Sequence, residues 1–404
     1  MIRILRLSDE GSIKEEMRKI KVDPYGIEIM LPKARHYLLQ INNVSNITAN
    51  ILKQEMLSLG GDVAVARDAL TGHVTSTDCL MMGNLSQLER LNQKLQKQPF
   101  GLGKIAQELS VTLRNYQMER FTLVCGRFKL NLGTKTHIMG IVNLTPDSFS
   151  GDGLYQKVRS SEFGVRSEVL KIVERMIEDG ADMIDIGGES TRPQARKISV
   201  KEEISRTLPV IKVLAKRIRV PISIDTYKPE VAKRALDVGA VMVNDITGLK
   251  DPQMIKVVKE YEAGVVIMHM KGTPRTMQKD PHYVSLIEEI IRFLSQAIRR
   301  SIDAGISREK IVIDPGLGFG KTPEHNLKLL NSLEEFKVLG RPLLVGPSRK
   351  SFIGKILNVE PQERLSGTIS SCVLAAHNGA KILRVHDVKE VHQALKIYDA
   401  VTCN

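Results

Sequence analysis

The amino-acid sequence predicts an α/β fold: a (β/α)8 TIM barrel over residues 121–404, which follows a small α/β domain over residues 1–120. Two observations support this prediction. Short apolar runs of strand length alternate eight times with stretches of helical periodicity. Nearly every apolar run also ends abruptly in a polar residue, and in a barrel the chemistry lies at the C-terminal ends of the strands. A doubly wound open sheet is the alternative, but it needs a topological switch and far fewer polar strand ends.

The first 120 residues show weaker patterns than the rest of the chain. Gly60 and Gly61 end one helical stretch, and leucines recur on one face of the next. We expect strands at residues 26–30, 62–66 and 77–82, and helices at residues 41–57, 85–95 and 105–113. No motif in this part points to chemistry, so we interpret it as an accessory domain of unknown role. A further hypothesis is an interaction module that docks a partner enzyme or helps a dimer to form.

The remaining residues supply the elements of the barrel in order. Residues 121–132 predict a hairpin ahead of the first long strand. Apolar runs then predict strands at residues 138–142, 183–188, 220–224, 241–243, 264–268, 311–313, 342–345 and 381–383. Apolar residues at helical spacing, with stops such as Gly180, predict helices at residues 168–178, 201–216, 229–238, 254–260, 283–304, 323–336, 361–377 and 388–398.

Composition narrows the class of partner. The net charge is +13, with an excess of 6 positive charges in residues 1–135 and 7 in the remainder, so the basic residues are not packed into one tail. A net positive charge of this size favours binding to nucleic acid, to a membrane surface or to a small anionic substrate. Trp is absent, aromatic residues are only 4% of the chain, and no nucleic-acid reader motif is present. We therefore expect a small anionic substrate and no nucleic-acid partner.

The sequence also bears on compartment. No apolar run approaches the ~18 residues of a membrane span, and no basic and apolar leader opens the chain. The four cysteines share no metal-ligand spacing, and we expect reduced structural thiols at Cys79, Cys125, Cys372 and Cys403. We therefore expect a cytoplasmic protein with no membrane partner.

Polar residues at the strand ends are the candidate site. They are Asn143, Thr191, Asp225, Asn244, His269, Asp314, Lys350, and Arg384 with His386. Buried carboxylates need hydrogen-bond donors, so three Asp or Asn ends around one apolar mouth suit a flat heterocycle rich in N–H groups. For a single residue such as Asp225, capping of the following helix is the better interpretation. Three residues at equivalent ends favour a ligand.

The loops after strands seven and eight predict a phosphate site, as these loops commonly do in barrels. Residues 346–351 and 384–387 carry Arg and Lys side chains, which suit phosphate oxygens. For Arg349 alone we prefer solvated surface charge. The amide oxygen of Asn143 suits a Mg²⁺ ion that bridges a diphosphate. We interpret His269 as a satisfied histidine behind the site rather than a catalytic one. Residues 316–321 lack the dinucleotide spacing, and we expect a tight loop there.

Over about residues 121–404 these motifs resemble the dihydropteroate synthases of the pterin-binding barrel family. The motifs occur in one order and are specific as a set: Met139–Asn143, Thr145–Ser150, Gly187–Pro193, Ser223–Thr226, Asn244–Asp245, His269–Met270, Asp314–Gly316, Ser348–Lys350 and Arg384–Asp387. The resemblance implies a transferase of folate biosynthesis. Its reaction joins 6-hydroxymethyl-7,8-dihydropterin diphosphate to 4-aminobenzoate and gives 7,8-dihydropteroate and diphosphate.

The resemblance also implies roles for single residues. It assigns the pterin to Asp225, Asn244, Asp314 and Lys350, of which Asp225, Asp314 and Lys350 are the catalytic candidates. It assigns the diphosphate to Asn143, Arg384 and His386, the Mg²⁺ cofactor to Asn143, and the aminobenzoate pocket to Thr191, Arg192, Phe319 and Ser348. Residues 145–153 and 190–197 would be two mobile loops that close over the second substrate, and the family usually forms homodimers.

The sequence departs from the family in three places. Gly151 precedes Asp152 where the family usually places the Asp directly after Ser150, and Gln194 stands where Gly is common. Both changes lie in the expected mobile loops and concern the geometry of loop closure, not the reaction. The first ~120 residues are absent from common single-domain members.

Two alternatives remain at this stage. Methyltransferases that serve a corrinoid use the same barrel, but they need no diphosphate site. A non-catalytic pterin-binding regulator would show losses among the strand ends or loops, and we find none.

Overall fold

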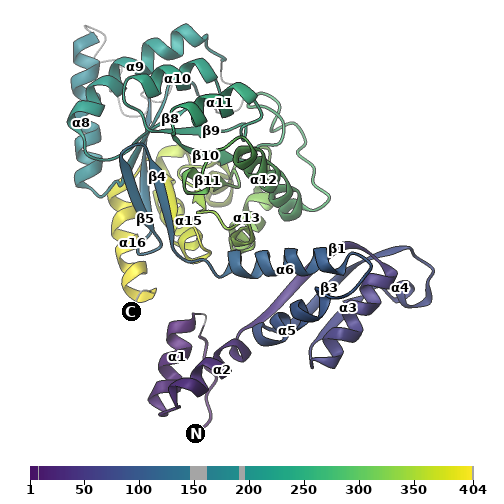
Figure 1. Ribbon diagram of the computed structural model, residues 1–404. Coiled ribbons are helices and arrows are strands. Elements are labelled where there is room, and N and C mark those ends of the chain that lie inside the picture. The colour runs from purple at the N-terminus through teal and green to yellow at the C-terminus, as the bar shows by residue number, and fades with distance from the viewer. Residues whose placement is uncertain (8, 146–161, 191–195, 403–404) are drawn as a thin grey trace. The chain divides into compact units, whose positions relative to one another are not determined.

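The computed structural model describes residues 1–7, 9–145, 162–190 and 196–402. The chain forms two compact units, Met1–Arg114 and Asn115–Asn404 (Figure 1). We describe each unit by itself.

The first unit contains a three-stranded antiparallel sheet with the strand order β1-β3-β2. Its strands are β1 (His36–Ser45), β2 (Asp62–Val65) and β3 (Ser76–Asn84). Its helices are α1 (Glu10–Lys19), α2 (Pro24–Ala34), α3 (Asn46–Ser58), α4 (Arg67–Thr71), α5 (Leu85–Leu95) and α6 (Leu102–Tyr116). The apolar faces of α3, α5 and α6 bury side chains such as Leu52, Leu88 and Leu109 in one core with Val63 and Met81 of the sheet.

Two expectations for this unit are wrong. The strand expected at residues 26–30 is part of helix α2, which begins because the Asp23 side chain accepts from Tyr25 N and Pro24 occupies the first turn. The helix expected at residues 41–57 begins only at Asn46, and the residues before it pair with β3 as strand β1. The other expected strands and helices of this unit are confirmed.

The second unit is the predicted barrel, and its fold class is confirmed. Eight parallel strands follow the order β11-β10-β9-β8-β7-β6-β13-β12, and a parallel bridge from Ile313 to Leu343 links the two ends of the sheet. The strands are β6 (His137–Asn143), β7 (Met183–Gly187), β8 (Ile222–Asp225), β9 (Met242–Asp245), β10 (Gly264–Met268), β11 (Ile311–Asp314), β12 (Leu344–Val345) and β13 (Ile382–Val385).

Helices surround these strands (Figure 1). They are α8 (Glu162–Glu178), α9 (Val200–Arg217), α10 (Pro229–Asp237), α11 (Pro252–Glu260), α12 (Leu286–Asp303), α13 (Pro323–Asn331), α14 (Ser351–Leu357), α15 (Leu365–His377) and α16 (Val388–Thr402). Strands β7 and β10 are buried along their whole length because helices cover the outer face and side chains fill the interior.

The predicted hairpin closes the N-terminal end of the barrel. It consists of β4 (Phe121–Cys125) and β5 (Phe128–Leu132). Its residues Leu123, Cys125 and Leu132 form one buried cluster with Met139 and Met183 from the starts of barrel strands. Because this end is packed shut, the C-terminal strand ends are the face on which a site can open.

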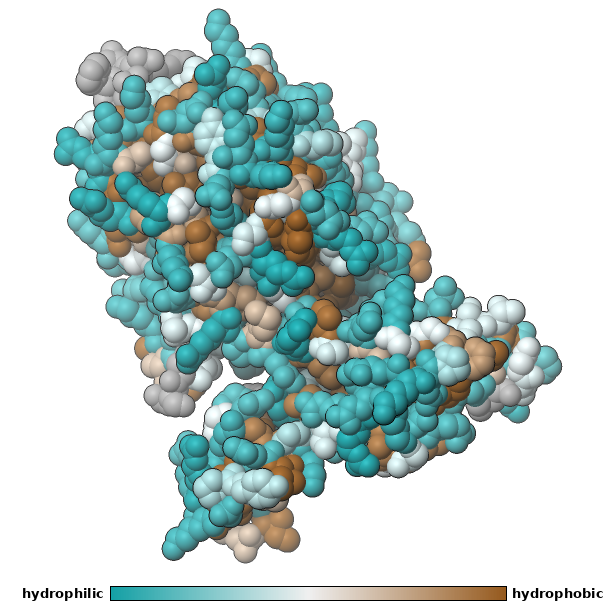
Figure 2. All heavy atoms as spheres, viewed as in Figure 1, coloured by the Kyte–Doolittle hydropathy of each residue, from teal (hydrophilic) through white to brown (hydrophobic). Residues whose placement is uncertain are grey.

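Two barrel helices differ from expectation. The sixth ends at Asn331 and is followed by a 3-10 turn at Leu333–Leu339, and the seventh begins only at Leu365. Helix α14, which follows Lys350 directly, was not predicted. Hydrophilic residues cover most of the surface visible in Figure 2, with apolar residues between them. In the described ranges, no helix has the length and apolar content needed to cross a membrane.

Candidate active site

Arg384 joins two carboxylates at the C-terminal end of the barrel. Its Nε donates to Asp185 Oδ2 at 2.6 Å, and its Nη2 donates to Asp225 Oδ2 at 2.7 Å. The Asn244 side chain donates from Nδ2 to the same Asp185 oxygen at 2.9 Å. The parallel register places Asp225 beside Asn244. The ends of strands β7, β8, β9 and β13 therefore share one hydrogen-bond network.

The structure shows that Asp225 does not cap the helix that follows it. Helix α10 begins at Pro229, its N-cap residue is Lys228, and it has no side-chain cap. The Asp225 carboxylate instead accepts from Arg384, so the capping interpretation is wrong for this residue.

Asp185 is a site residue that the sequence reasoning missed. It is fully buried within strand β7 and holds both Arg384 and Asn244. The signal was an acidic residue inside the apolar run of residues 183–186. A buried carboxylate at such a position requires a partner, and only the closed barrel brings Arg384 to it.

The electrostatics of the network follow from burial. Burial raises the pKa of Asp225 to about 7, against the opposing charge of Arg384 and with further help from Asp185. Burial also opposes the charge of Arg384, but Asp185 and Asp225 outweigh it and raise the pKa of the guanidinium. Arg384 therefore stays a cation, while Asp225 titrates near neutrality.

A second pair of groups lies at the ends of β11 and β12. Asp314 is buried, and its Oδ1 accepts from Gly316 N at 2.7 Å. Burial raises the pKa of this carboxyl. The Nζ atom of Lys350 lies 4.4 Å from the ring centroid of Phe319. Burial, together with the charge of Arg384, lowers the pKa of Lys350 to about 8 even though Asp314 favours its charged form.

Two buried oxygens of the network around Arg384 make no hydrogen bond to the described residues. Within the part of the chain that the structure describes, Asp185 Oδ1 and Asn244 Oδ1 have no hydrogen-bond partner. Buried acceptors of this kind are costly unless a donor reaches them. Of the two residues, Asn244 is one that the sequence predicted to bind a heterocycle with N–H donors, and Asp185 lies beside it in the same network.

His386, which follows strand β13, contacts residues at two other strand ends. Its Nε2 lies 3.4 Å from Asn143 Nδ2, and its Nδ1 lies 3.0 Å from Ser348 Oγ. Arg349 points to a different partner, since its Nε and Nη2 donate to the two Asp387 oxygens at 3.1 and 2.5 Å. Arg349 is therefore an ion-paired residue rather than free surface charge.

Lys321, which the sequence reasoning also missed, supports the loop that carries Phe319. This lysine is 2% exposed, and its Nζ donates to the carbonyls of Gly316 and Phe319 and lies 3.1 Å from His269 Nδ1. Burial, with the charge of Lys321 adding to it, lowers the pKa of His269 to about 2, so the imidazole is a neutral acceptor. The view of His269 as a satisfied histidine is confirmed. The expected tight loop is also present, with three glycines at positive φ.

The described residues fit Mg²⁺ only as an ion whose ligands come partly from the protein and partly from the substrate phosphates and water. Among the described residues, no group of three or more His, Cys, Asp or Glu side chains is placed to hold a metal. The Asn143 amide nitrogen contacts His386, and the amide oxygen is the atom of this side chain that would bind a cation. Mg²⁺ typically binds one or two protein oxygens and completes its octahedron with substrate phosphates and water, so one amide oxygen is a fitting donor set.

Part of the expected site lies outside the described residues. This applies to Thr191 and Arg192 and to residues 146–153 and 191–195 of the two expected loops.

Comparison with known proteins identifies the family. Residues 139–386 match the family model described as pterin binding enzyme. The dihydropteroate synthase of Escherichia coli is 47% identical over 264 residues, which is 65% of this chain and 91% of that protein. The structure of the Yersinia pestis dihydropteroate synthase in a sulfonamide drug complex superposes with a TM-score of 0.66 at 42% identity, over 70% of this chain and 100% of that one.

A third relative also covers most of the N-terminal unit. The probable bifunctional folylpolyglutamate synthase/dihydropteroate synthase of Halobacterium salinarum is 38% identical over 396 residues, which is 96% of this chain and 45% of that protein. The chain therefore belongs to the dihydropteroate synthases, the pterin-binding enzymes of folate biosynthesis.

Proposed function

We propose that the chain performs the reaction of its family at the C-terminal ends of the barrel strands. In that reaction 4-aminobenzoate displaces the diphosphate of 6-hydroxymethyl-7,8-dihydropterin diphosphate and gives 7,8-dihydropteroate. The observation that supports the proposal is the Asp185–Arg384–Asp225 bridge, because it pairs a permanent cation with a buried carboxylate, and the proposal assigns these two groups to the diphosphate and to the pterin.

The pterin would bind to Asp225, Asn244, Asp314 and Lys350. The carboxylates and the unpaired Asn244 oxygen would accept from the N–H groups of the ring, and the Lys350 ammonium would donate to a ring acceptor. The apolar side chains that pack beside this edge, among them Ile246 and Met268, suit the faces of a flat ring. The site therefore combines edge acceptors with apolar faces, as expected for a heterocycle.

The diphosphate would bind to Asn143, Arg384 and His386, with Mg²⁺ held by Asn143 and supplying further charge neutralisation when bound. As the carbon–oxygen bond breaks, Arg384 stabilises the negative charge on the leaving group, and Asp225 and Asp314 favour the positive charge on the pterin methylene. The neutral amine of 4-aminobenzoate then attacks the methylene carbon, and the resulting anilinium nitrogen, which is strongly acidic, loses its proton to water. No strong base is required, and the residues act by position and electrostatics.

The second substrate would lie against Thr191, Arg192, Phe319 and Ser348. Phe319 contacts the Lys350 ammonium and Ser348 contacts His386, so each of these two side chains lies beside a residue proposed for the first substrate. This arrangement supports a pocket adjacent to the reacting carbon.

A homodimer is proposed from the exposed apolar side chains of neighbouring helices. Ile356 of α14 is 55% exposed and Leu374 of α15 is 51% exposed, and Leu327 of α13 and Leu357 of α14 are exposed as well. Helices α13, α14 and α15 pack against one another, and a cluster of this kind is typical of an interface. A cytoplasmic location is proposed because Cys79, Cys125 and Cys372 are free thiols.

Neither earlier alternative is supported by the site. A corrinoid methyltransferase does not require a diphosphate site, which the proposal builds from Asn143, His386 and Arg384. A regulator without activity would not be expected to keep every candidate group among the described strand ends.

The proposal predicts that diphosphate release requires both 4-aminobenzoate and Mg²⁺. Release from the pterin diphosphate is measured with and without each component, and dihydropteroate is identified by mass spectrometry. We expect turnover only in the complete mixture. Tight pterin binding without turnover in the complete mixture would favour a regulatory protein.

The titrating groups predict a bell-shaped pH profile for kcat/KM of the pterin diphosphate. The apparent pKa values are expected near those of Asp225, about 7, and Lys350, about 8. Below the first, protonated Asp225 loses its acceptor role, and above the second, Lys350 loses its charge. Lys350→Arg is expected to remove the alkaline limb. A flat profile between about pH 6 and 9 would contradict these assignments.

A further inference from the structure

Lys321 is a buried cation that has no part in the reaction described above. Its side chain is 2% exposed, and its Nζ donates to the Gly316 carbonyl at 2.9 Å and to the Phe319 carbonyl at 3.1 Å. Its third neighbour is His269 Nδ1, at 3.1 Å. Burial is the main cause that lowers the pKa of His269 to about 2, so this nitrogen belongs to a neutral ring. The three acceptors match the three N–H donors of an ammonium group.

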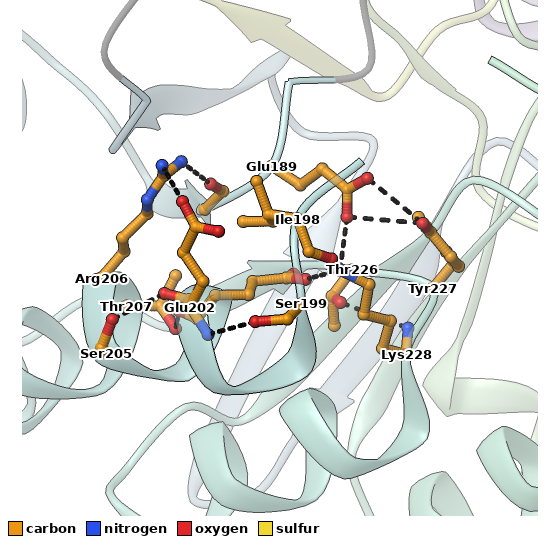
Figure 3. A network of polar contacts seen from close by, with 12 residues as sticks. Glu189, Ile198, Ser199, Glu202, Ser205, Arg206, Thr207, Thr226, Tyr227 and Lys228 are labelled. Carbon is orange, nitrogen blue, oxygen red and sulfur yellow. Dashed lines mark hydrogen bonds and ion pairs between the residues drawn. The ribbon is translucent and has the colours of Figure 1, made fainter. Parts of the chain in front are cut away.

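A second buried lysine, Lys228, has a different kind of partner. Its Nζ contacts Glu189 Oε2 at 2.5 Å and Glu203 Oε2 at 2.6 Å, and Figure 3 shows the Lys228 and Glu189 side chains directed toward each other. Burial opposes the charge of Lys228, but its hydrogen bonds to these carboxylates outweigh burial and raise its pKa. Burial lowers the pKa of Lys321 to about 7, against the opposing charge of Asp314. Because a buried charge with neutral acceptors costs free energy, stability alone is a poor explanation for Lys321.

The two carbonyls that Lys321 contacts belong to one tight turn. Phe319 N donates to the Gly316 carbonyl at 3.2 Å, and Gly318, the third residue of the turn, has a φ of +80°, as a type II turn requires. The lysine bridges the first and the last carbonyl of this turn. One ammonium group thus fixes the separation of the two ends and ties both to His269, which directly follows strand β10.

Both ends of the turn contact groups that the proposed function assigns to substrates. At its start, Gly316 N donates to Asp314 Oδ1 at 2.7 Å. At its end, the centroid of the Phe319 ring lies 4.4 Å from Lys350 Nζ, and the ring packs against the apolar cluster that contains Met268. The turn therefore connects a carboxylate proposed for the pterin with an aromatic ring proposed for 4-aminobenzoate.

We propose that Lys321 is a positioning residue for the second substrate. By joining the carbonyls of Gly316 and Phe319, it holds the Phe319 ring where that ring lines the 4-aminobenzoate pocket. The inference rests on the assignment of Phe319 to this pocket under the proposed function. Its consequence falls on KM for 4-aminobenzoate, because the bond from Gly316 N to Asp314 does not involve the lysine.

Lys321→Met is the direct test. Methionine fills nearly the same volume, removes the ammonium group and also removes its desolvation cost, so the fold is expected to survive. Tyr283→Phe is the matched control. The Tyr283 hydroxyl donates to the buried Gly320 carbonyl at 2.8 Å, so this variant also takes a side-chain donor from a carbonyl of the same loop. Gly320 lies just outside the turn, and only Lys321→Met releases the turn itself.

We expect Lys321→Met to raise KM for 4-aminobenzoate about tenfold, equivalent to about 1.4 kcal/mol. The dissociation constant of the pterin diphosphate, measured by calorimetry, should change less than about threefold. A general loosening of the barrel would move both constants together, so the difference between them identifies a positioning role. Tyr283→Phe should lower the thermal midpoint by a few degrees while it changes KM for 4-aminobenzoate less than about twofold.

His269→Leu is a second and smaller change to the same group of contacts. It removes the third acceptor of the ammonium and leaves both carbonyl contacts, so KM for 4-aminobenzoate should rise about threefold. His269→Asn keeps an acceptor near the place of Nδ1 and should restore most of the native KM. If Lys321→Met does not fold, an unchanged KM in His269→Leu overturns the inference.

An unchanged KM in Lys321→Met, or an equal rise in Tyr283→Phe, would also overturn it. Phe319→Ala, measured beside them, separates this failure from that of the proposed function. If Phe319→Ala raises KM for 4-aminobenzoate while Lys321→Met does not, the assignment of Phe319 stands and the role of Lys321 falls. An unchanged KM in Phe319→Ala overturns the assignment of that ring and the inference with it.

Discussion

Replacing Arg384 by methionine is expected to lower kcat for dihydropteroate formation by about 10²–10³-fold and to destabilise the barrel by about 3–5 kcal/mol. The loss of activity follows because the proposed cation for the departing diphosphate is gone. The loss of stability follows because Asp185 and Asp225 remain buried without the guanidinium that joins them. Steady-state kinetics and urea unfolding measure the two effects on one preparation.

Arg349→Met is the matched control. Arg349, which follows strand β12, pairs with an aspartate as Arg384 does, but its side chain is 36% exposed. An ion pair with that exposure contributes at most about 1 kcal/mol. Arg349→Met should therefore lose far less stability and keep most of its activity. If the two variants lose similar activity, the assignment of the leaving group to Arg384 is wrong.

The stability loss in Arg384→Met should depend on pH. Arg384 lowers the pKa of Asp225, so its removal raises that pKa above the value of about 7. A carboxyl whose pKa is higher in the folded than in the unfolded state stabilises the fold below its unfolded pKa, and this contribution disappears as pH rises through the folded pKa. Unfolding free energies should therefore show a larger deficit for the variant at about pH 8 than at about pH 5.

Asp314→Asn is expected to lower kcat/KM for the pterin diphosphate about 10²-fold, equivalent to about 3 kcal/mol for a lost charged acceptor. The fold should survive, because the asparagine oxygen still accepts from Gly316 N. Burial raises the pKa of the native carboxyl, so the neutral side chain also removes a desolvation cost. Activity and stability should thus separate in this variant, in contrast to Arg384→Met.

The barrel was predictable because its pattern is local. Each buried strand is a short apolar run, and Asp225, Asn244 and Asp314 follow such runs directly. The N-terminal unit was less predictable, because residues 36–45 form a strand only by pairing with β3. Helix α2 was missed because Ile27 and Ile29 alternate with polar residues as in a strand, while the start at Asp23 and Pro24 is decisive.

The sequence pattern did not indicate which residues at the strand ends contact one another. Asp185 meets Arg384 across 199 residues of chain, and Lys228 meets Glu189 across 39. A charged residue inside an apolar run indicates that a partner exists, but only closure of the barrel determines which one. The pattern therefore indicates where polar groups gather, and the fold determines how they pair.

The most direct test of this account is kcat/KM for the pterin diphosphate in Asp314→Asn beside Asp245→Asn. Asp245 also ends a barrel strand, but its carboxylate accepts from Thr247 N, Thr247 Oγ1 and Leu249 N, and so supports the turn after β9. We predict a loss of about 10²-fold in Asp314→Asn and a change of less than about threefold in Asp245→Asn. Equal losses in the two variants, or a loss in Asp245→Asn alone, would contradict a pterin site that includes Asp314.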